Sequence, residues 1–474
     1  MDCCNTGFQK KRLIIIGGGS AAFSAAIKGH ELGAEVTMIN DGLPIGGTCV
    51  NVGCVPSKTL IRAAEQVHRA NHHGFQGIIT SGRMTDFQAV MDQKRELVKE
   101  LRQAKYLDVV SDMEGFTRIT GHARFKDAHT VEVNGQDITG DVFLIATGAT
   151  TFAPDIPGLH ESGFLTNETA FELDTLPESM IVLGGRYIAL EVAQMFARFG
   201  TRVTVLQRSD RILPTESPDI SNAMQAYLED EDIQIVTGVS LGSVSREGNT
   251  VTVHATVNSK QWEFQAEQLL LATGRKPNTD GLGLESIGVE TDAIGSVQVD
   301  GQLSTSVPGI FAAGDVIGKR MFVYTAAAEG SLAATNGLTD ANKPFDATVL
   351  PWVIFTDPQL AGVGMDEVEA AALGFTVDVS VLPMSHVPRA IAARNTIGFV
   401  KLIRDRATDR IVGGRVLAPE GAEVIMEIAM AIRHQMTALE LAEMLHPYLT
   451  LAESVKLAAI AFGKDVNKLS CCAT

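Results

Sequence analysis

Near its N-terminus the chain reads Lys11-Arg-Leu-Ile-Ile-Ile16, and Gly17-Gly-Gly19-Ser-Ala-Ala22 follows at once. An apolar strand that ends in a glycine turn and continues as a helix, here expected from Phe23 to Leu32, is typical of dinucleotide binding. The glycines let the backbone approach a pyrophosphate at the helix N-terminus. The stretch predicts an α/β fold with a nucleotide site at Gly17, Gly19 and Ala22.

The strand expected next, Glu35 to Ile39, normally ends in an acid that holds the adenosine ribose. Asn40 stands there instead. Because an amide oxygen still accepts a hydrogen bond from a hydroxyl, we expect a modified ribose contact at Asn40 and not a lost site.

A second strand–turn unit begins at Ser179 to Leu183 and continues as Gly184-Gly-Arg186, with arginine in the middle glycine position. Its next strand, Arg202 to Leu206, is followed by Gln207-Arg208 and offers no acid for a free 2′-hydroxyl. Arginine suits a 2′-phosphate, so NADPH is favoured over NADH, with Arg208 as a contact. Ordinary solvated arginines are the alternative interpretation.

Three further turns each close an apolar strand: Thr147-Gly148, Thr273-Gly274 and Gly314-Asp315. The position of Asp315 suits a carboxylate that grips a flavin ribityl chain. From about Pro344 the pattern changes to strands such as Gly398 to Ile403 and helices such as Glu420 to His434. This tail predicts an α+β domain with a dimer surface.

The composition narrows the functional classes. At 474 residues the chain is too long for one core and predicts about three or four domains. A net charge of −17 argues against nucleic acid and anionic membrane surfaces. The sequence has no long apolar run and no signal-peptide pattern, so we expect a cytoplasmic protein without a membrane partner.

The six cysteines form three pairs: Cys3 with Cys4, Cys49 with Cys54, and Cys471 with Cys472. A disulfide framework is not expected in the cytosol, so the pairing indicates redox or metal chemistry. A disulfide between adjacent cysteines is strained, which favours an exchanging dithiol at Cys471 and Cys472. Thiolates bind soft metal ions, and we predict Cys49, Cys54, Cys471 and Cys472 as metal ligands. A chain end without function is the alternative for the tail.

The order of these motifs resembles the flavin-dependent pyridine nucleotide–disulfide oxidoreductases over essentially the whole chain. The central motif is Gly46-Gly47-Thr48-Cys49-Val-Asn-Val-Gly-Cys54-Val-Pro-Ser-Lys58. Within this family the chain is most similar to the mercuric reductases, through Ser470-Cys471-Cys472 and Pro447-Tyr448-Leu449-Thr450. It resembles the form without the N-terminal metal-binding domain that many of them carry.

The resemblance implies FAD in the first domain and NADPH in the second, with electrons passing through FAD to a redox-active Cys49/Cys54 disulfide. Cys54 is then the thiolate beside the flavin and Cys49 the exchange thiol. Pro56 suits the first turn of a helix, and a helix N-terminus lowers a thiol pKa. The remaining predicted contacts are Gly47, Thr48, Thr147, Gly148 and Gly274 for the cofactors, the ion pair Lys58–Glu191 beside the flavin, and Tyr187 as the gate of the nicotinamide pocket.

The segment from His446 to Glu453 distinguishes members of the family by the substrate they reduce. Glutathione, dihydrolipoamide and thioredoxin reductases carry His-Pro-Thr-x-x-Glu, in which the histidine shuttles a proton. Here the residue five positions before Glu453 is Tyr448, whose hydroxyl has a pKa of about 10 and is a poor shuttle. A metal ion needs no shuttle. If His446-Pro447 is aligned instead, with two residues inserted, a disulfide reductase returns as the alternative.

The resemblance implies that Hg(II) is captured by Cys471 and Cys472 and passed to Cys49 and Cys54 of the other subunit of a homodimer. Tyr448 and Tyr106 match tyrosines of the metal site, and two electrons convert the ion to Hg(0). A half-buried tyrosine on an amphipathic helix is the alternative for Tyr106. A flavoprotein that only sequesters metal is the alternative function.

We expect four segments. They are a first part of the FAD domain at 1–152, an NADPH domain at 153–276, a returning FAD segment at 277–343 and a dimerisation domain with the dithiol tail at 344–474.

Overall fold

The structure is a computed structural model that describes residues 10–468. Cys3, Cys4, Cys471 and Cys472 lie outside the described residues. The chain forms two compact units, each built from three segments. The first unit comprises Met1–Ser57, Met91–Pro154 and Thr273–Phe345, and the second comprises Lys58–Val90, Asp155–Ala272 and Asp346–Thr474. The four sequence-based segments stay a prediction.

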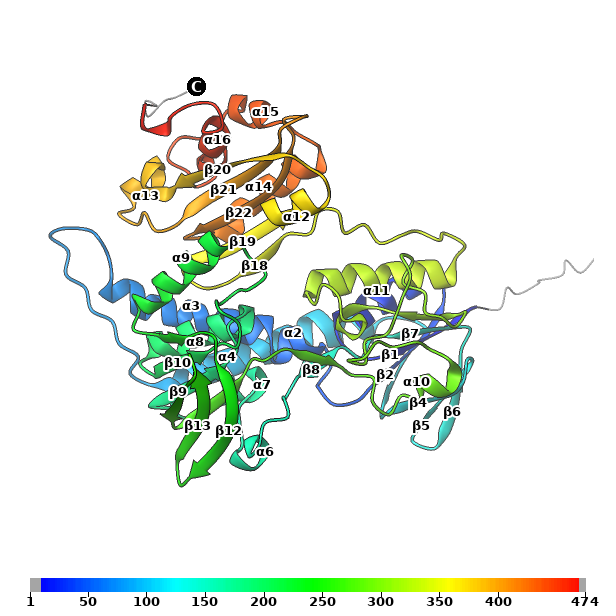
Figure 1. Ribbon diagram of the computed structural model, residues 1–474. Helices are drawn as coiled ribbons and strands as arrows, with labels where there is room; N and C mark the ends of the chain where they lie inside the picture. Colours follow the sequence, from blue (N-terminus) through cyan, green and yellow to red (C-terminus); the bar gives the residue numbers. More distant parts are fainter. Residues whose placement is uncertain (1–9, 469–474) are drawn as a thin grey trace, which may run out of the picture. The chain divides into compact units, whose positions relative to one another are not determined.

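The first unit is built on a parallel sheet of five strands, which Figure 1 shows beside helix α11. In spatial order the strands are β17 (Ile310–Ala312), β7 (Val142–Ile145), β1 (Arg12–Ile16), β2 (Glu35–Asn40) and β3 (Phe116–Thr120). The central strands are apolar along their length because a parallel sheet is covered on both faces.

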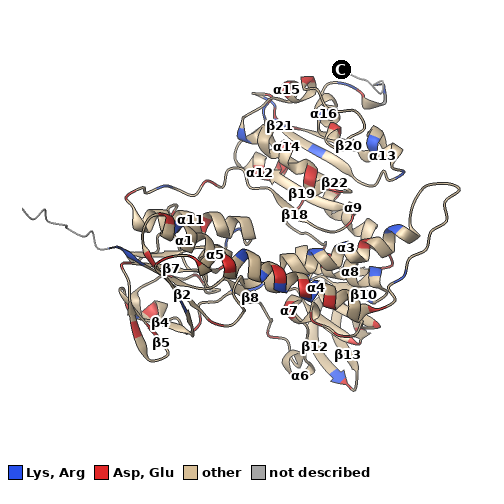
Figure 2. Ribbon diagram, turned by 180° about the vertical axis from the view of Figure 1, so that it is seen from behind, with Lys and Arg blue, Asp and Glu red and all other residues tan. Residues whose placement is uncertain are grey.

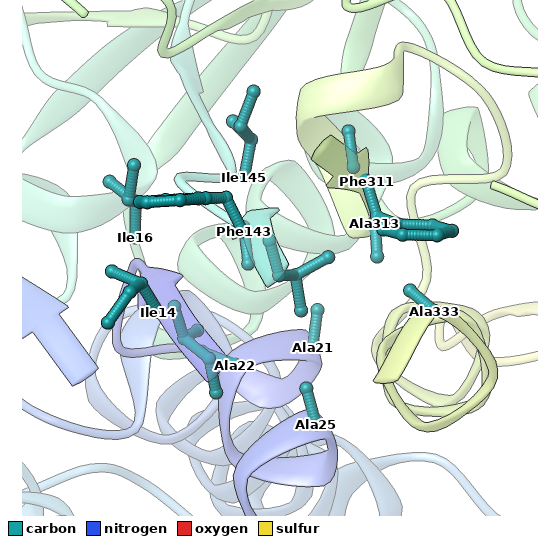
Figure 3. Packing of buried hydrophobic residues seen from close by; sticks show 14 of the residues in the cluster. Ile14, Ile16, Ala21, Ala22, Ala25, Phe143, Ile145, Phe311, Ala313 and Ala333 are labelled. Carbon is teal, nitrogen blue, oxygen red and sulfur yellow. The ribbon is translucent and has the colours of Figure 1, made fainter. Parts of the chain in front are cut away.

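Two helices with small residues pack together in this unit: α1 (Ser20–Glu31) and α11 (Val323–Leu338). In Figure 3 the alanines of α1 lie next to the sheet residues Ile14 and Phe143. The approach is closest at Gly330, where an added Cβ would lie 2.1 Å from the carbonyl oxygen of Ala21. Small side chains therefore set the distance between these helices.

Two smaller sheets complete the strands of the first unit. One is antiparallel, with β4 (Ala123–Asp127), β5 (Thr130–Val133) and β6 (Gln136–Thr139). The other pairs β8 (Ala149–Thr151) with β16 (Arg275–Pro277).

The second unit contains a parallel four-stranded sheet that includes the second strand–turn motif. Its strands are β11 (Gln234–Val236), β10 (Arg202–Leu206), β9 (Ser179–Leu183) and β15 (Gln268–Leu271). A three-stranded antiparallel sheet is formed by β12 (Ser240–Glu247), β13 (Thr250–Val257) and β14 (Lys260–Ala266). The strands β9 and β10 have the bounds expected from the sequence.

The C-terminal part of the second unit contains an antiparallel sheet of five strands. They are β18 (Trp352–Ile354), β19 (Gln359–Gly364), β22 (Ile411–Ala418), β21 (Phe399–Asp405) and β20 (Val377–Pro383). Helices α14 (Gly421–Arg433) and α16 (Glu453–Ile460) pack on it. This arrangement confirms the expected fold class, two nucleotide-binding sheets followed by an α+β domain.

The longer remaining helices are α3 (Cys54–Asn71), α4 (Phe87–Arg102), α8 (Tyr187–Phe199) and α9 (Pro218–Glu229). The shorter α-helices are α2 (Gly47–Asn51), α5 (Asp108–Ser111), α6 (Leu159–Ser162), α7 (Asn167–Ala170), α10 (Leu284–Ile287), α12 (Glu367–Ala372), α13 (Pro388–Ala392) and α15 (Ala438–Glu443). One π-helical turn, η1 (Gln103–Leu107), and three 3₁₀ turns, η2 (Gly314–Ile317), η3 (Met384–His386) and η4 (Val466–Lys468), complete the helices.

Acidic and basic residues alternate along α4 (Figure 2). Within residues 10–468, none of the helices combines the length and the apolar character that crossing a membrane requires.

The Gly330 contact gives a stability prediction. Replacing Gly330 by Ala favours the helix by propensity, but it forces a methyl group against a backbone carbonyl that has no rotamer to change. We expect the free energy of unfolding to fall by about 1–3 kcal/mol, measured by urea unfolding. The matched control is Gly463→Ala, because a Cβ there meets nothing within 4 Å, and it is expected to change the value by less than about 0.5 kcal/mol. Equal stabilities of the two variants would contradict the packing argument.

Candidate functional site

The two cysteines of the central motif lie in the first unit, on two consecutive helices. Cys49 is in α2, and Cys54 is the first residue of α3, where the helix dipole favours a thiolate. Both residues carry half-buried thiols. The chain enters α2 through Gly46 and Gly47, whose φ values of +98° and +61° suit glycine. Thr48 precedes Cys49 in the same helix.

Tyr106 lies beside both cysteines. Burial raises the pKa of its hydroxyl, the charges of Cys49 and Cys54 raise it further, and a hydrogen bond with Ser20 opposes this. Its ring meets Phe23 edge-on, with centroids 4.9 Å apart. The residue is on the π-helical turn η1 and not on a regular amphipathic helix, and such turns are frequent at functional sites.

Asn51 is a buried residue of this site that sequence reasoning missed. Its Nδ2 donates to the carbonyl oxygens of Pro44, Ile45 and Gly47 at 2.9, 3.1 and 2.8 Å. Its Oδ1 accepts from Arg102 Nη1 at 3.1 Å, and Arg102 immediately precedes η1. One amide therefore connects the loop before Cys49 to the turn that carries Tyr106. Its place between two cysteines was the only signal in the sequence.

The first glycine turn forms a close backbone cradle. A Cβ at Gly17 would lie 2.1 Å from the carbonyl oxygen of Ala146, and one at Gly47 would lie 2.6 Å from Gly19 Cα. Ala22 is fully buried in α1 behind the turn. The bare backbone at the start of a helix fits the pyrophosphate of a dinucleotide such as FAD.

The polar residues near the cradle are placed by local hydrogen bonds. Asn40 is the last residue of β2 and donates through Nδ2 to Leu43 O at 2.9 Å. Thr147 donates through Oγ1 to Asn278 O at 2.6 Å. Gly148 and Gly274 adopt positive φ values of +72° and +132°. These residues hold the turns in place, while their contacts to a cofactor stay predictions.

Two acids lie together at the turn after β17. Asp315 Oδ2 lies 3.6 Å from Arg275 Nε, and burial raises the pKa of its carboxyl. Glu329 is fully buried, and its Oε2 accepts from Gly314 N at 2.9 Å. Burial raises the pKa of Glu329 to about 7. Its Oε1 is a buried oxygen without a hydrogen-bond partner, so it can still accept a hydrogen bond from a ligand such as the ribityl chain of FAD.

The expected ion pair is present in the second unit. Lys58 Nζ lies 2.7 Å from Glu191 Oε2, and the Glu191 side chain is only 8% exposed. Glu191 Oε1 also accepts from Phe355 N at 2.9 Å, and Lys58 Nζ lies 4.5 Å above the Phe355 ring. The carboxylate is thus fixed on both oxygens, which fixes the position of the lysine cation.

The second glycine turn precedes α8. A Cβ at Gly184 would lie 2.3 Å from the carbonyl oxygen of Ala272, which gives the same close approach as at Gly17. Tyr187 is the first residue of α8 and is half-buried, and burial raises its pKa to about 12. The side chains of Arg186 and Arg208 are exposed, as a contact to a 2′-phosphate requires.

The residues of the tail differ in their surroundings. Tyr448 is 50% exposed. The side chain of His446 is 6% exposed; its Nε2 lies 2.6 Å from Glu427 Oε1 and its Nδ1 lies 3.2 Å from Met444 O. Both ring nitrogens are therefore engaged by groups of the same unit. Glu453 begins α16, and its Oε2 is buried without a hydrogen-bond partner.

Among residues 10–468, no cluster of three or more His, Cys, Asp or Glu side chains is arranged to hold a metal ion. The described site therefore contains a two-thiol arrangement and not a closed cage. A pair of thiolates binds a soft ion while leaving positions open for exchange.

Comparison with known proteins identifies the family. The model of the pyridine nucleotide-disulphide oxidoreductases matches residues 11–330, and that of their dimerisation domain matches residues 350–459. The chain belongs to the pyridine nucleotide-disulphide oxidoreductase family. As a family member with a dimerisation domain, it forms a homodimer.

Relatives within this oxidoreductase family share a name. Proteins named mercuric reductase from Staphylococcus aureus and Bacillus cereus are 44% and 45% identical over 97% of this chain and 84% and 73% of their own. One from Streptomyces lividans is 43% identical over 99% of both chains. The solved structure of the HOCl-induced flavoprotein disulfide reductase RclA from Escherichia coli is 31% identical, with a TM-score of 0.84 over 94% of this chain and 98% of that one.

Asn51 gives the first prediction for the site. In Asn51→Asp, carboxylate oxygens face three carbonyl oxygens in place of the amide donor. We expect the free energy of unfolding to fall by about 3 kcal/mol and iodoacetamide to alkylate Cys49 faster, measured by urea unfolding and by mass spectrometry of the reduced protein. The control is Asn71→Asp at the exposed end of α3. An unchanged alkylation rate in Asn51→Asp would show that Asn51 does not position Cys49.

Glu329 gives a second prediction, on pH dependence. Its folded pKa of about 7 lies above the ordinary 4.5, so its contribution to stability is present below pH 4.5 and is lost as the pH rises through 7. The charged groups that face it are Asp315, which raises the pKa, and Lys319 and Arg320, which lower it. Glu329→Gln has no such ionisation.

We expect the unfolding free energy of Glu329→Gln, relative to that of the wild type, to rise by about 3 kcal/mol from pH 4.5 to pH 7.5, because only the wild type loses stability there. Urea unfolding at several pH values measures the difference. A difference between the two proteins that is constant with pH would refute the assignment.

Proposed function

We propose that this flavoenzyme catalyses the NADPH-dependent reduction of Hg(II) to Hg(0) in mercury detoxification. The observation that carries the proposal is the position of the Tyr106 ring against the loop that leads to Cys49, where a Cβ added at Gly46 would lie 3.3 Å from the ring atoms Cδ2 and Cε2. The high identity to proteins named mercuric reductase over nearly the whole chain supports it. FAD and NADPH are the cofactors, and Hg(II) is the substrate.

The residues proposed to hold the cofactors are those of the two glycine turns and their neighbours. FAD is held by Gly17, Gly19, Ala22, Asn40, Gly47, Thr48, Lys58, Thr147, Gly148, Gly274 and Asp315, and NADPH by Gly184, Tyr187, Glu191 and Arg208. When bound, FAD relays two electrons from NADPH to the cysteine pair and the metal. The carboxylate of Glu191, fixed on both oxygens, holds the Lys58 cation where negative charge develops.

The thiol chemistry follows from the placement of the cysteines. Cys49 and Cys54 bind Hg(II) as thiolates, the ion accepts two electrons, both Hg–S bonds break, and Hg(0) leaves. Because its pKa is raised, the Tyr106 hydroxyl stays neutral at physiological pH and adds no charge beside the thiolates. It is then available to steady the ion while one thiolate replaces another. An open pair of ligands permits this exchange, whereas a closed cage would retain the metal.

We further propose that the site is shared across the homodimer. Cys471 and Cys472 deliver the metal from the other subunit, and the exposed Tyr448 of that subunit faces the arriving ion. These assignments rest on the matching of motifs. The enzyme is proposed to act in the cytoplasm, where thiols are kept reduced, and without a membrane partner.

The main alternative is a disulfide reductase of the thioredoxin, glutathione or dihydrolipoamide type. Such an enzyme needs an imidazole that exchanges protons with a substrate thiol. His446 is the only histidine in the stretch from Ala438 to Thr474, and Glu427 and Met444 O engage both its nitrogens. Its low exposure and the contact of its second nitrogen with Met444 O favour a packed side chain over a proton shuttle. A flavoprotein that only sequesters metal is the other alternative. It would need no electron transfer and therefore gives no reason for the ion pair Lys58–Glu191.

The test compares NADPH consumption with Hg(II) in excess thiol against consumption with glutathione disulfide, lipoamide and thioredoxin. We expect turnover with Hg(II). The double variant Cys471→Ala/Cys472→Ala should lose most of this turnover while NADPH still reduces the flavin. The matched control is Cys3→Ala/Cys4→Ala, which removes the other adjacent pair. Rapid reduction of an organic disulfide that is abolished in His446→Ala, together with no activity toward Hg(II), would overturn the proposal.

A further inference from the structure

Tyr187 rests on a tryptophan that the proposed function does not use. Its ring stacks on the indole of Trp352, with centroids 5.6 Å apart and planes inclined by 16°. Tyr187 is the first residue of α8, directly after the second glycine turn, and Trp352 is the first residue of β18. Both residues lie in the second unit and are half-buried.

Away from Tyr187, the indole belongs to a row of three paired residues on three neighbouring strands. Trp352 is paired with Gly362 on β19, and Gly362 is paired with Arg415 on β22. A Cβ at Gly362 would lie 2.4 Å from Trp352 Cζ2 and 2.8 Å from Arg415 Cδ, so only glycine leaves room for this row. The guanidinium carbon of Arg415 lies 5.4 Å from the indole centroid, a cation–π contact.

Arg415 cannot follow a moving indole. Its Nε lies 2.7 Å from Glu216 Oε2, with side-chain exposures of 5% and 6%, and its Nη1 donates to Gly414 O at 3.1 Å. Breaking a buried ion pair of this kind leaves a charge without its partner away from water, so the row is rigid at this end. At the other end, the Tyr187 backbone is fixed in α8 beside the buried Ala189 and Leu190, directly after the second glycine turn.

We propose that Trp352 is a positioning residue: its indole is the resting platform of Tyr187, and Tyr187 leaves it when the nicotinamide of NADPH binds. This inference rests on the proposed function, in which Tyr187 gates the nicotinamide pocket. A stacked aromatic pair contributes stabilising free energy beyond its buried area. If nicotinamide binding displaces Tyr187, this free energy is lost and the affinity for the nucleotide is lower by that amount. Removing the indole removes that cost, and nucleotide affinity rises by about two- to tenfold.

The chain offers a direct reporter because it contains two tryptophans, Trp352 and the 50% exposed Trp262 on β14. In the holoenzyme variant Trp262→Phe, all tryptophan emission comes from Trp352. We expect titration with NADP⁺ to change this emission. The change should persist in Tyr187→Phe, which keeps the stacked ring, and be absent in Tyr187→Ala, which has none. Unchanged emission at saturating NADP⁺ in the Trp262→Phe protein would overturn the proposal.

Direct binding of NADP⁺ provides the second readout. We expect Trp352→Ala to bind about two- to tenfold more tightly than the wild type, Trp352→Phe to be close to the wild type, and the control Trp262→Phe to be unchanged. Equal affinities of Trp352→Ala and the wild type would also overturn the proposal. If Trp352→Ala does not fold, the response of Trp352 emission to NADP⁺ in the Trp262→Phe protein still decides the proposal.

The same measurements separate this inference from the proposed function. A wild-type protein that binds no NADP⁺ or does not oxidise NADPH with Hg(II) would refute the proposed function. A wild type that does both, with Trp352→Ala indistinguishable from it, would refute the role of Trp352 alone.

Discussion

Two stretches of bare backbone meet at Gly19 and Gly47, and the candidate site depends on this contact. A Cβ at Gly47 would lie 2.6 Å from Gly19 Cα, and Gly46 N donates to Gly18 O at 2.8 Å. The contact joins the start of α1, where a pyrophosphate is favoured, to the start of α2, which carries Cys49. The cysteine is thereby placed relative to the nucleotide turn by main-chain atoms, which have little freedom to move.

Side chains then build on this backbone contact. Ser20, the first residue of α1, bonds to Tyr106. Asn51, the last residue of α2, donates to two carbonyls of the preceding loop and to Gly47 O of its own helix, and it accepts from Arg102. Hydrogen bonds in the first unit therefore link the loop before Cys49, the residues around Tyr106 and the nucleotide turn. A displacement of a reacting group by about 1 Å can slow a reaction strongly. The hydrogen bonds that hold this loop in place therefore matter for the exchange of a metal ion between thiols.

The sequence was sufficient for the features that depend on neighbours along the chain. The strands Ser179–Leu183 and Arg202–Leu206 were predicted with their observed bounds, because each is an apolar run that ends where the turn chemistry changes. The helix expected from Glu420 to His434 is observed as Gly421–Arg433 with those two residues as its caps. The family-based expectation of the ion pair Lys58–Glu191 is also met in space.

Features that depend on distant segments were not predictable. The π-helical turn at Gln103–Leu107 has no sequence signature, because it arises from packing of Tyr106 against Phe23 and the cysteine loop. The Trp352 platform requires Gly362 and Arg415 on two other strands, and only the register of the sheet brings them together.

In the proposed function, one substitution in the C-terminal segment changes the chemistry that a shared fold supports. On the alignment that the proposed function uses, the position that is histidine in disulfide reductases is Tyr448, and the nearby His446 lies in a 2.6 Å contact with Glu427. The His446 side chain is 6% exposed, and both of its ring nitrogens already have partners, Glu427 Oε1 and Met444 O. A tyrosine hydroxyl beside thiolates can donate a hydrogen bond but does not exchange protons readily near neutral pH. The surroundings thus favour a substrate that needs ligand exchange over one that needs proton transfer, which is the chemical difference between a thiol-bound metal ion and a disulfide.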